Sequence, residues 1–446
     1  MNTEIRETRA AIYQRIRTTK AGEYVGQRVR LAGWVHRLRR LGAINFLVLR
    51  DGYGLFQAVI DDEARLEPLN GLQTETVIEL EGLVVAEPQA PGGLELHDCQ
   101  IEVITPVTET LPFEINKKVL KPGLDVFLDH APVGLRHPQK HATFRLFSGV
   151  LAGFRASLTE QGFTEIQTPK LVGTATESGA NVFAVDYFQQ RAYLAQSPQF
   201  YKQTMVGVFE RVFEVGPVFR AEPHSTSRHI NQYTSLDAEM GFIRDHRDVM
   251  HVLTNVIRRI VCALGEGYRR ELAQVQAPAL PAIPDTIPSI KFRDGQAIIQ
   301  KAFGEDCRAE NDLSPQHERW LCQWAQETHG SELLFVTHYP TSKRPFYTMP
   351  DPEDPEHTYS FDLLFRGTEI VTGGQRVHRY EQLLDHAARW KIDPDLIAGY
   401  LEAFRYGMPP HGGFGMGAER LTLMLVGGSN LRETTLFPRD MKRLSP

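Results

Sequence analysis

The stretch FRAEPHSTSRHINQYTSLDAEMGF, residues 219–242, is the most informative part of this chain. It has the pattern of two antiparallel β-strands joined by a polar loop. Side chains two residues apart on a strand share a face, so we expect Arg220 and Glu222 on one side of the outgoing strand. Asp237 and Glu239 are likewise expected to share a face of the returning strand. The pattern predicts a hairpin with acids and bases close together.

The polar loop of this hairpin adds Arg228 and His229. Such a group suits a polyanionic ligand that also carries nitrogen bases, such as ATP. A surface hairpin with cross-strand ion pairs would have the same pattern, so this stretch alone leaves both interpretations open.

Two further stretches lie on either side of the hairpin. HGGFGMGAERLTLMLVG, residues 411–427, places a glycine-rich backbone before an apolar helix, which would let a phosphate or a planar base approach closely. It is neither a Walker A motif nor a dinucleotide-binding fingerprint. QGFTEIQTPKLV, residues 161–172, ends a helix at Gly162 and a strand at Pro169, and is typical of an interface element.

The N-terminal part has a different pattern. Residues 28–105 contain five short strand-like runs separated by Gly, Asp and Pro: RVRLAGWVHRL, INFLVLRDG, LFQAVID, TVIELEGLVVAE and LELHDCQIEVI. They favour a small closed barrel of the oligonucleotide-binding (OB) type, although a β-sandwich would have a similar pattern. Residues 1–60 hold eleven Lys or Arg and four Asp or Glu, whereas the whole chain carries −6, which suggests a basic module on an acidic body.

Composition excludes several classes of protein. Of 446 residues, 42% are hydrophobic, but no window holds the ~18 consecutive apolar residues of a membrane span. The N-terminus has no apolar signal segment, and the four cysteines are scattered without a CxxC pair. We therefore expect a cytoplasmic protein without a membrane segment, a disulfide framework or a zinc site.

The expected architecture is α+β. Residues 1–108 form the predicted five-stranded OB barrel, and residues 109–140, rich in Pro and Lys, form a hinge. Residues 141–446 form a larger domain built on an antiparallel sheet flanked by helices, with a small helical insertion around 266–330.

The stretches at 161–172, 219–242 and 411–427 resemble, in this order and at these separations, motifs 1, 2 and 3 of class II aminoacyl-tRNA synthetases. The N-terminal barrel is similar to the anticodon-binding domain of the subclass that uses aspartate, asparagine and lysine. The hinge, the absence of a large insertion between motifs 2 and 3, and the ending LFPRDMKRLSP resemble the archaeal and eukaryotic branch of aspartyl-tRNA synthetases. The resemblance implies ATP, L-aspartate and tRNA(Asp) as substrates and a homodimer formed through motif 1.

The resemblance also assigns the amino-acid site. Lys202 and Arg376 match cations that bind the side-chain carboxylate of aspartate, and without that carboxylate two buried cations would be left unpaired. Asp237, with Glu177 or Ser178 from a TESGA loop, is expected to receive the α-ammonium group, and Gln199 lies beside Lys202 in the same motif.

For ATP, the resemblance makes Arg220 and Arg420 the catalytic arginines. Glu222 matches the acceptor for the adenine amino group and Tyr233 the aromatic residue under the ring. Four further residues are expected to contact ATP: Arg228, His229, Gly415 and Gly417. Glu369 and Thr372 are expected to bind Mg²⁺, and Asp362 is a further Mg²⁺ candidate.

On the barrel, Phe46, Gln57 and Glu95 match residues that stack on and hydrogen-bond the central anticodon bases, and Arg30 and Arg50 are expected to support the RNA backbone. His36 and Pro88 stand where stricter relatives have bulky or basic residues, which favours an enzyme that charges tRNA(Asn) as well as tRNA(Asp). The alternatives are an asparagine enzyme, a paralogue that has lost tRNA charging, and a plain oligonucleotide-binding protein.

Overall fold

The computed structural model describes residues 15–42, 44–173, 181–223 and 226–445. The chain divides into two compact units, Met1–Pro138 and Gln139–Pro446, and each is described by itself. No helix in the described ranges is long and apolar enough to cross a membrane.

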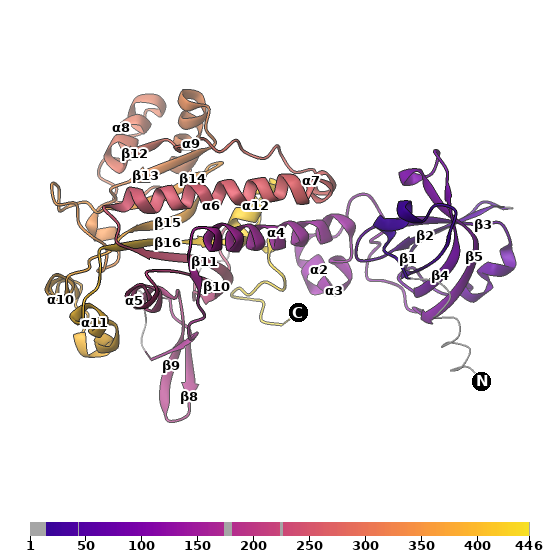
Figure 1. Ribbon diagram of the computed structural model, residues 1–446, viewed down its shortest axis with the longest axis horizontal. Helices are drawn as coiled ribbons and strands as arrows, with labels where there is room; N and C mark the ends of the chain where they lie inside the picture. The colour runs from indigo at the N-terminus through magenta and orange to yellow at the C-terminus, as the bar shows by residue number, and fades with distance from the viewer. Residues whose placement is uncertain (1–14, 43, 174–180, 224–225, 446) are drawn as a thin grey trace. The chain divides into compact units, whose positions relative to one another are not determined.

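The first unit is a closed five-stranded barrel with the strand order β1-β2-β3-β5-β4 (Figure 1). Its strands are β1 Arg28–Arg40, β2 Asn45–Arg50, β3 Leu55–Ile60, β4 Val77–Ala86 and β5 Leu94–Thr105. Burial alternates along β4, as expected when one face of each strand points into the barrel. Leu31, Leu47, Leu49 and Ile78 fill the interior and are wholly buried. The barrel, rather than the β-sandwich, is confirmed.

The segment after the barrel packs back onto it. It contains the short helices α2 Leu124–Asp129 and α3 Ala131–Gly134. Arg50 donates two hydrogen bonds of 2.7 Å to the buried carboxylate of Glu75, which also accepts one from Arg136 at 3.2 Å. Arg50, which the sequence suggested as a support for RNA, is therefore a buried structural residue.

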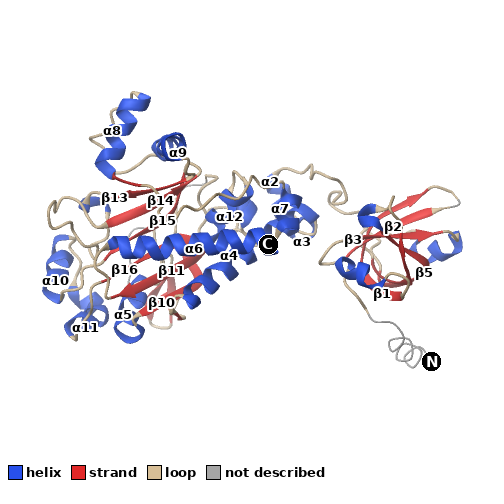
Figure 2. Cartoon of the chain, turned by 45° about the horizontal axis from the view of Figure 1, so that its top comes forward, coloured by secondary structure: helices blue, strands red, loops and turns tan. Residues whose placement is uncertain are grey.

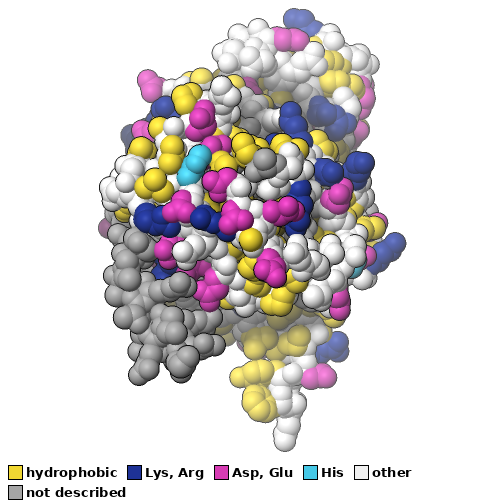
Figure 3. Space-filling view, turned by 90° about the vertical axis from the view of Figure 1, so that its right-hand side faces the viewer, with side chains coloured by type: hydrophobic (Ala, Val, Ile, Leu, Met, Phe, Trp, Pro, Cys, Tyr) yellow, Lys and Arg dark blue, Asp and Glu magenta, His cyan; other side chains and the backbone are white. Residues whose placement is uncertain are grey.

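The face of the molecule in Figure 3 shows acidic and basic side chains side by side. The excess of basic residues in the N-terminal sequence therefore does not appear as one continuous patch among the described residues of that face. This mixing accords with the ion pairs within the barrel, such as Arg28 and Arg65 with Asp98.

The second unit is built on an eight-stranded sheet with the order β12-β13-β14-β15-β16-β11-β10-β6. The strands are β6 Thr164–Glu165, β10 Arg211–Phe219, β11 Gln232–Gly241, β12 Ser289–Lys291, β13 Leu333–Thr337, β14 Ser360–Phe365, β15 Thr368–Gln375 and β16 His411–Gly417. All neighbours are antiparallel except the two end pairs, β12–β13 and β10–β6, which are parallel. The α+β prediction is confirmed, with a mixed sheet in place of a purely antiparallel one.

Two long helices, α4 Pro138–Glu160 and α6 His246–Gly267, lie side by side across one face of this sheet (Figures 1 and 2). Apolar residues at helical spacing on both helices, including Phe154 and Ile260, pack against sheet residues such as Phe213 and Phe414. This layer forms the main core and makes the sheet a rigid platform for the opposite face.

The remaining helices border the sheet. Helices α5 Gln199–Phe209, α10 Tyr380–Arg389 and α11 Ala398–Arg405 share a core around Phe200 and Tyr400. Helices α8 Phe292–Phe303 and α9 Pro315–His329 pack over β13, and α12 Ala418–Val426 follows β16. Helix α7 Arg269–Val275 and a small sheet of β7 Leu171–Val172, β9 Gln190–Leu194 and β8 Ala184–Tyr187 complete the unit.

Candidate active site and nucleic-acid interface

One cleft of about 290 Å³ gathers the predicted residues of the second unit. It opens over strands β11, β15 and β16 and is bordered by α5 and α12. The predicted residues that line it are Gln199, Lys202, Arg220, Glu222, Arg228, His229, Tyr233, Asp237, Glu369, Thr372, Arg376, Gly415, Gly417 and Arg420. Glu177 and Ser178 lie outside the described residues. Residues far apart in the sequence thus meet in one place, as a small-molecule site requires.

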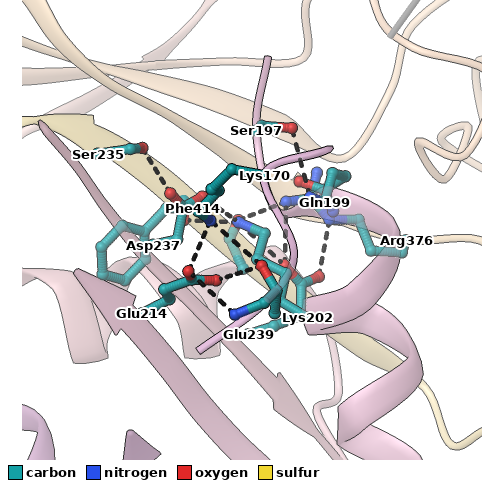
Figure 4. A network of polar contacts seen from close by, with 12 residues as sticks. Lys170, Ser197, Gln199, Lys202, Glu214, Ser235, Asp237, Glu239, Arg376 and Phe414 are labelled. Carbon is teal, nitrogen blue, oxygen red and sulfur yellow. Dashed lines mark hydrogen bonds and ion pairs between the residues drawn. The ribbon is translucent and has the colours of Figure 1, made fainter. Parts of the chain in front are cut away.

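Lys202 extends from α5 beneath the cleft, with its side chain only 1% exposed (Figure 4). Its ammonium group donates to Asp237 Oδ1 at 2.9 Å and to the backbone carbonyl of Phe414 at 2.9 Å. Glu239 Oε2 lies 3.4 Å away. Ser235 also donates to Asp237, so this carboxylate is held on two sides.

Arg376 follows β15 and forms the second buried ion pair of the cleft (Figure 4). Its Nε donates to Glu239 Oε1 at 2.8 Å, and Nη2 donates to the Gly413 carbonyl at 3.1 Å. Burial opposes ionisation of Glu239, but the nearby charges of Arg376 and Lys202 outweigh burial and hold its pKa below the usual value.

These pairs correct one expectation from the sequence. Lys202 and Arg376 were expected to be unpaired without a substrate carboxylate, but Asp237 and Glu239 already balance them within the protein. The reason is that β11 brings both carboxylates to the same face, two residues apart, directly over the two cations.

The glycine-rich run forms strand β16. It pairs with β11 so that Gly413 lies opposite Glu239 and Gly415 opposite Asp237. A Cβ atom on Gly413 would collide with Glu239 Oε2 and the Ala238 carbonyl, and one on Gly415 would lie 3.2 Å from Asp237 Oδ1. The glycines therefore make room for the two carboxylates as well as for a ligand above them.

Arg220 and Glu222 do not share a strand as expected, because β10 ends at Phe219 and both residues lie in the following loop. The backbone N–H of Arg220 still donates to the Asn231 carbonyl, which closes the hairpin. The Arg220 guanidinium carbon lies 5.8 Å from the ring centre of Tyr233 on β11. Arg220, Glu222 and Tyr233 therefore meet in the cleft despite the early end of the strand.

Arg228 and His229 border the cleft from the same loop. Arg228 Nη2 donates to Glu318 Oε2 at 2.6 Å, and His229 Nδ1 lies 2.7 Å from Thr226 Oγ1. Glu318 belongs to α9, within the segment expected to be an insertion, and nothing in the sequence pattern singled it out.

Glu369, Thr372 and Arg420 form a second polar group in the cleft. Thr372 Oγ1 donates to Glu369 Oε1 at 3.0 Å, and Arg420 Nη1 donates to the Glu369 carbonyl at 2.8 Å. Arg420 Nη1 also lies 3.7 Å from Glu369 Oε1. The cleft thus places a carboxylate, a hydroxyl and a cation together.

Asp362 lies on β14 directly opposite Thr372. Its Oδ2 accepts a 2.8 Å hydrogen bond from Arg344, whereas its buried Oδ1 has no hydrogen-bond partner among the described residues. Burial raises the pKa of Asp362 to about 6, an effect that Arg344 opposes and Glu369 reinforces. An orphaned carboxylate oxygen beside Glu369 and Thr372 fits the oxygen ligands that Mg²⁺ prefers. Arg344, from an irregular loop, was missed by the sequence analysis.

The barrel brings Phe46, Gln57 and Glu95 close together, with Phe46 half-buried and Gln57 and Glu95 buried. Gln57 Nε2 donates to Glu95 Oε1 at 2.8 Å, and Arg39 donates to Gln57 Oε1 at 2.7 Å. The Arg39 guanidinium also lies over the ring of Phe46, 5.3 Å from its centre, and His97 Nε2 is 3.0 Å from Glu95. Arg39 and His97 therefore extend the predicted group.

His36 and Pro88 lie elsewhere on the barrel. His36 stands at a bulge of β1, is 7% exposed, and has its pKa lowered to about 4 by burial and by the charge of Arg50. Pro88 is exposed in the turn between β4 and β5. Arg30 forms a 3.6 Å ion pair with Glu79. None of these three has a hydrogen bond to Phe46, Gln57 or Glu95 in the described part of the chain.

Comparison with known proteins follows the same division of the chain. Residues 124–441 match the family of tRNA synthetases class II (D, K and N), and residues 29–104 match the OB-fold nucleic acid binding domain. The aspartate–tRNA(Asp/Asn) ligase of Thermus thermophilus is 46% identical over 97% of this chain and 99% of its own length. The enzyme of the same name from Deinococcus radiodurans is 45% identical, with the same coverage.

A solved structure, asparaginyl-tRNA synthetase from Pyrococcus horikoshii in complex with asparaginyl-adenylate, is 32% identical and superimposes with a TM-score of 0.86. The match covers 95% of this chain and 97% of that one. The fold, the grouped cleft residues and these full-length matches agree: the chain belongs to the class II tRNA synthetases of the aspartate, lysine and asparagine group.

Proposed function

We propose that this protein is an aspartate–tRNA ligase, which activates L-aspartate with ATP to aspartyl-adenylate and transfers it to the 3′ end of tRNA. The observation that carries the proposal is the pair of buried cations, Lys202 and Arg376, at the base of the cleft. A buried carboxylate needs paired cations, and Lys202 and Arg376 supply two charged donor groups at this place, which favours the carboxylate of aspartate over the neutral amide of asparagine.

The hydrogen bonds within the cleft leave donor groups that can bind this substrate. Arg376 uses Nε and Nη2 on Glu239 and Gly413, so the two N–H groups of Nη1 have no hydrogen-bond partner among the described residues. These donors would bind the side-chain carboxylate of aspartate together with Lys202. Asp237, held by Lys202 and Ser235, would accept the α-ammonium group.

The reaction requires positioning more than acid–base catalysis. The α-carboxylate of aspartate is already a nucleophile and attacks the α-phosphorus of ATP, with pyrophosphate as the leaving group. Arg220 would bind both the α-phosphate and the attacking carboxylate, and Arg420 the outer phosphates, because preorganised cations stabilise the charge that develops there. Glu222 and Tyr233 would hold the adenine, Gly415 and Gly417 would let ATP approach the sheet, and Arg228 and His229 would contact the outer phosphates.

Mg²⁺ is the proposed metal, and it neutralises phosphate charge when bound. Glu369 and Thr372 would hold it, with Asp362 as a further ligand, because their oxygens lie on one face of the sheet. Gln199, at the start of α5, would border the amino-acid end of the same cleft.

For the tRNA, we infer that Phe46 stacks on a central anticodon base while Gln57 and Glu95 contact base edges. We further infer that both tRNA(Asp) and tRNA(Asn) are charged, since the relatives named above carry that dual specificity in their names. Homodimerisation through residues 161–172 is part of the proposal, supported by the exposed strand β6 at the end of the sheet. The proposed site of action is the cytoplasm.

Aspartate-dependent exchange of pyrophosphate into ATP tests the first half of this function. Exchange with aspartate and little or none with asparagine is expected. The opposite preference would make the protein an asparagine enzyme, and no exchange with either would make it a paralogue without this activity. Charging of purified tRNA(Asp) and tRNA(Asn) transcripts tests the second half, and charging of tRNA(Asp) alone would remove the dual specificity.

A further inference from the structure

Helix α9 delivers one buried carboxylate to the edge of the cleft. The helix begins with Ser314, whose hydroxyl accepts from the His317 N–H, while the His317 ring accepts from the Ser314 N–H. This capping box fixes the first turn, where Glu318 is only 8% exposed. Glu318 thus projects from a rigid helix end and not from a mobile loop.

Glu318 Oε2 accepts two hydrogen bonds from different parts of the site. One comes from Arg228 Nη2 at 2.6 Å, and the other from the backbone N–H of Glu369 at 3.2 Å. Arg228 lies on the loop between β10 and β11, and Glu369 is on β15. A single oxygen therefore ties the loop that borders the proposed ATP site to the strand that carries the proposed Mg²⁺ ligands.

Arg228 keeps donors for a second partner. A guanidinium group has five N–H donors in a fixed plane, and Glu318 uses one nitrogen of Arg228. The Arg228 backbone is held separately, because its N–H donates to Thr226 Oγ1 at 3.2 Å. The Arg228 side chain is 30% exposed and lines the cleft, so it can bind an anion there without leaving Glu318.

We propose that Glu318 is a positioning residue for the activation step, which holds the Arg228 guanidinium beside Glu369 so that it meets the terminal phosphates of ATP. This inference rests on the proposed function, because it takes ATP as the occupant of the cleft. It makes the segment around α9 a part of the active site. Glu318 is not among the residues that line the cleft, whereas Arg228 is, so Glu318 would act on ATP only through Arg228.

A purely structural ion pair would behave differently. It would lower the stability of the fold when broken, but it would change the binding of ATP and of aspartate alike. A positioning role predicts a selective loss of ATP binding that depends on Arg228. Glu327 is exposed on the same helix, and its carboxylate accepts a hydrogen bond from Gln323, so it offers a matched control.

The experiment compares full-length wild type, Glu318→Ala, Glu318→Gln and Glu327→Ala. Calorimetric titration with ATP and Mg²⁺ gives the affinity without any amino acid, and pyrophosphate exchange gives KM for ATP and for aspartate. Glu318→Ala should weaken ATP binding by about ten-fold, the usual effect of one charge-assisted hydrogen bond, with KM for aspartate nearly unchanged. Glu318→Gln keeps an acceptor oxygen and should restore part of the affinity, and Glu327→Ala should match wild type.

A double-mutant cycle completes the test. Adding Glu318→Ala to Arg228→Ala should cause no further loss of ATP affinity, because Glu318 acts only through that arginine. The proposal is overturned if Glu318→Ala binds ATP as Glu327→Ala does, or if it weakens ATP binding equally with and without Arg228. If Glu318→Ala does not fold, Glu318→Gln decides, and wild-type ATP affinity in that variant also overturns it. Wild type that binds ATP but shows no aspartate-dependent exchange would instead refute the proposed function.

Discussion

Glu369 and Thr372 face the same side of strand β15 although three positions separate them. Alternation along a strand would place them on opposite faces, but Ile370 is an extra residue in the ladder, because Leu363 pairs with Val371 and Leu364 with Glu369. The bulge brings the Thr372 hydroxyl to 3.0 Å from the Glu369 carboxylate. A local irregularity of the sheet thus builds the proposed Mg²⁺ site.

Replacement of Thr372 tests this arrangement. Thr372→Ser keeps the hydroxyl and should leave activity within about two-fold of wild type, since it removes one methyl group from an exposed side chain. Thr372→Val keeps the shape but removes the oxygen, so the Mg²⁺ concentration needed for half-maximal pyrophosphate exchange should rise. Equal Mg²⁺ requirements in the two variants would show that the hydroxyl is not a ligand.

The two arginines give a prediction about chemistry. Arg220→Ala and Arg420→Ala should each lower the rate of pyrophosphate exchange by ~10²-fold or more, because each removes a cation from the reacting phosphates. Both side chains lie at the surface of the cleft and not in the core, so the circular-dichroism spectrum and melting temperature should stay close to wild type. Near-normal exchange in either variant would contradict the assignment of the motifs.

Many of the residues that meet in the cleft were predictable from the resemblance, because they lie in short motifs such as residues 219–242 and 411–427. Asp237 on an alternating strand and Arg420 at the start of an apolar helix are examples. The bulge at Ile370 was not predictable, because its sequence reads as an ordinary β-strand. Glu318 and Arg344 were not predicted as site residues for a different reason. Each reaches the site through long-range packing of a segment whose own sequence contains no recognisable functional motif.

Long-range packing also explains why the sequence analysis expected Lys202 and Arg376 to be unpaired in the absence of a substrate carboxylate. Sequence distinguished Lys202 and Arg376 as cations, but only the register of β11 against β16 shows that Asp237 and Glu239 face them across glycines. Closure of the barrel was predicted from five strand-like runs, whereas the buried pairing of Arg50 with Glu75, which Arg136 also contacts, depends on tertiary packing.

Lys202 should therefore affect both stability and substrate choice. Lys202→Leu leaves Asp237 and Glu239 buried without their shared cation, which should cost about 3–5 kcal/mol of unfolding free energy. It should also raise KM for aspartate steeply while leaving KM for ATP nearly unchanged. Lys202→Leu combined with Asp237→Asn should recover part of the stability but not the activation of aspartate. Unchanged aspartate kinetics in Lys202→Leu would refute the substrate assignment.

Pro88 offers a test of tRNA specificity. It is exposed in the turn after β4, so Pro88→Lys adds a basic side chain without displacing the core. If the absence of a basic group there relaxes recognition of the last anticodon base, this variant should shift charging toward tRNA(Asp) over tRNA(Asn). Gln89→Lys, at the exposed neighbouring position, controls for added charge alone. An equal ratio of the two charging rates in Pro88→Lys and wild type would exclude Pro88 as a determinant.

The buried histidines predict how stability depends on pH. Burial, and then the neighbouring His338, lower the pKa of His246 from 6.5 to about 4. A histidine with a lowered pKa binds its proton more readily in the unfolded chain, so its stabilisation is present above about pH 6.5 and is lost as the pH falls toward 4. The loss for His246 approaches about 3 kcal/mol, at up to about 1.4 kcal/mol per pH unit.

Urea unfolding of wild type and His246→Phe between pH 7.5 and 5 measures this loss of unfolding free energy. The wild type should lose stability more steeply than His246→Phe, whereas His251→Gln, at an exposed position of the same helix, should follow wild type. Parallel curves for wild type and His246→Phe would mean that the His246 ring is protonated as readily in the fold as outside it.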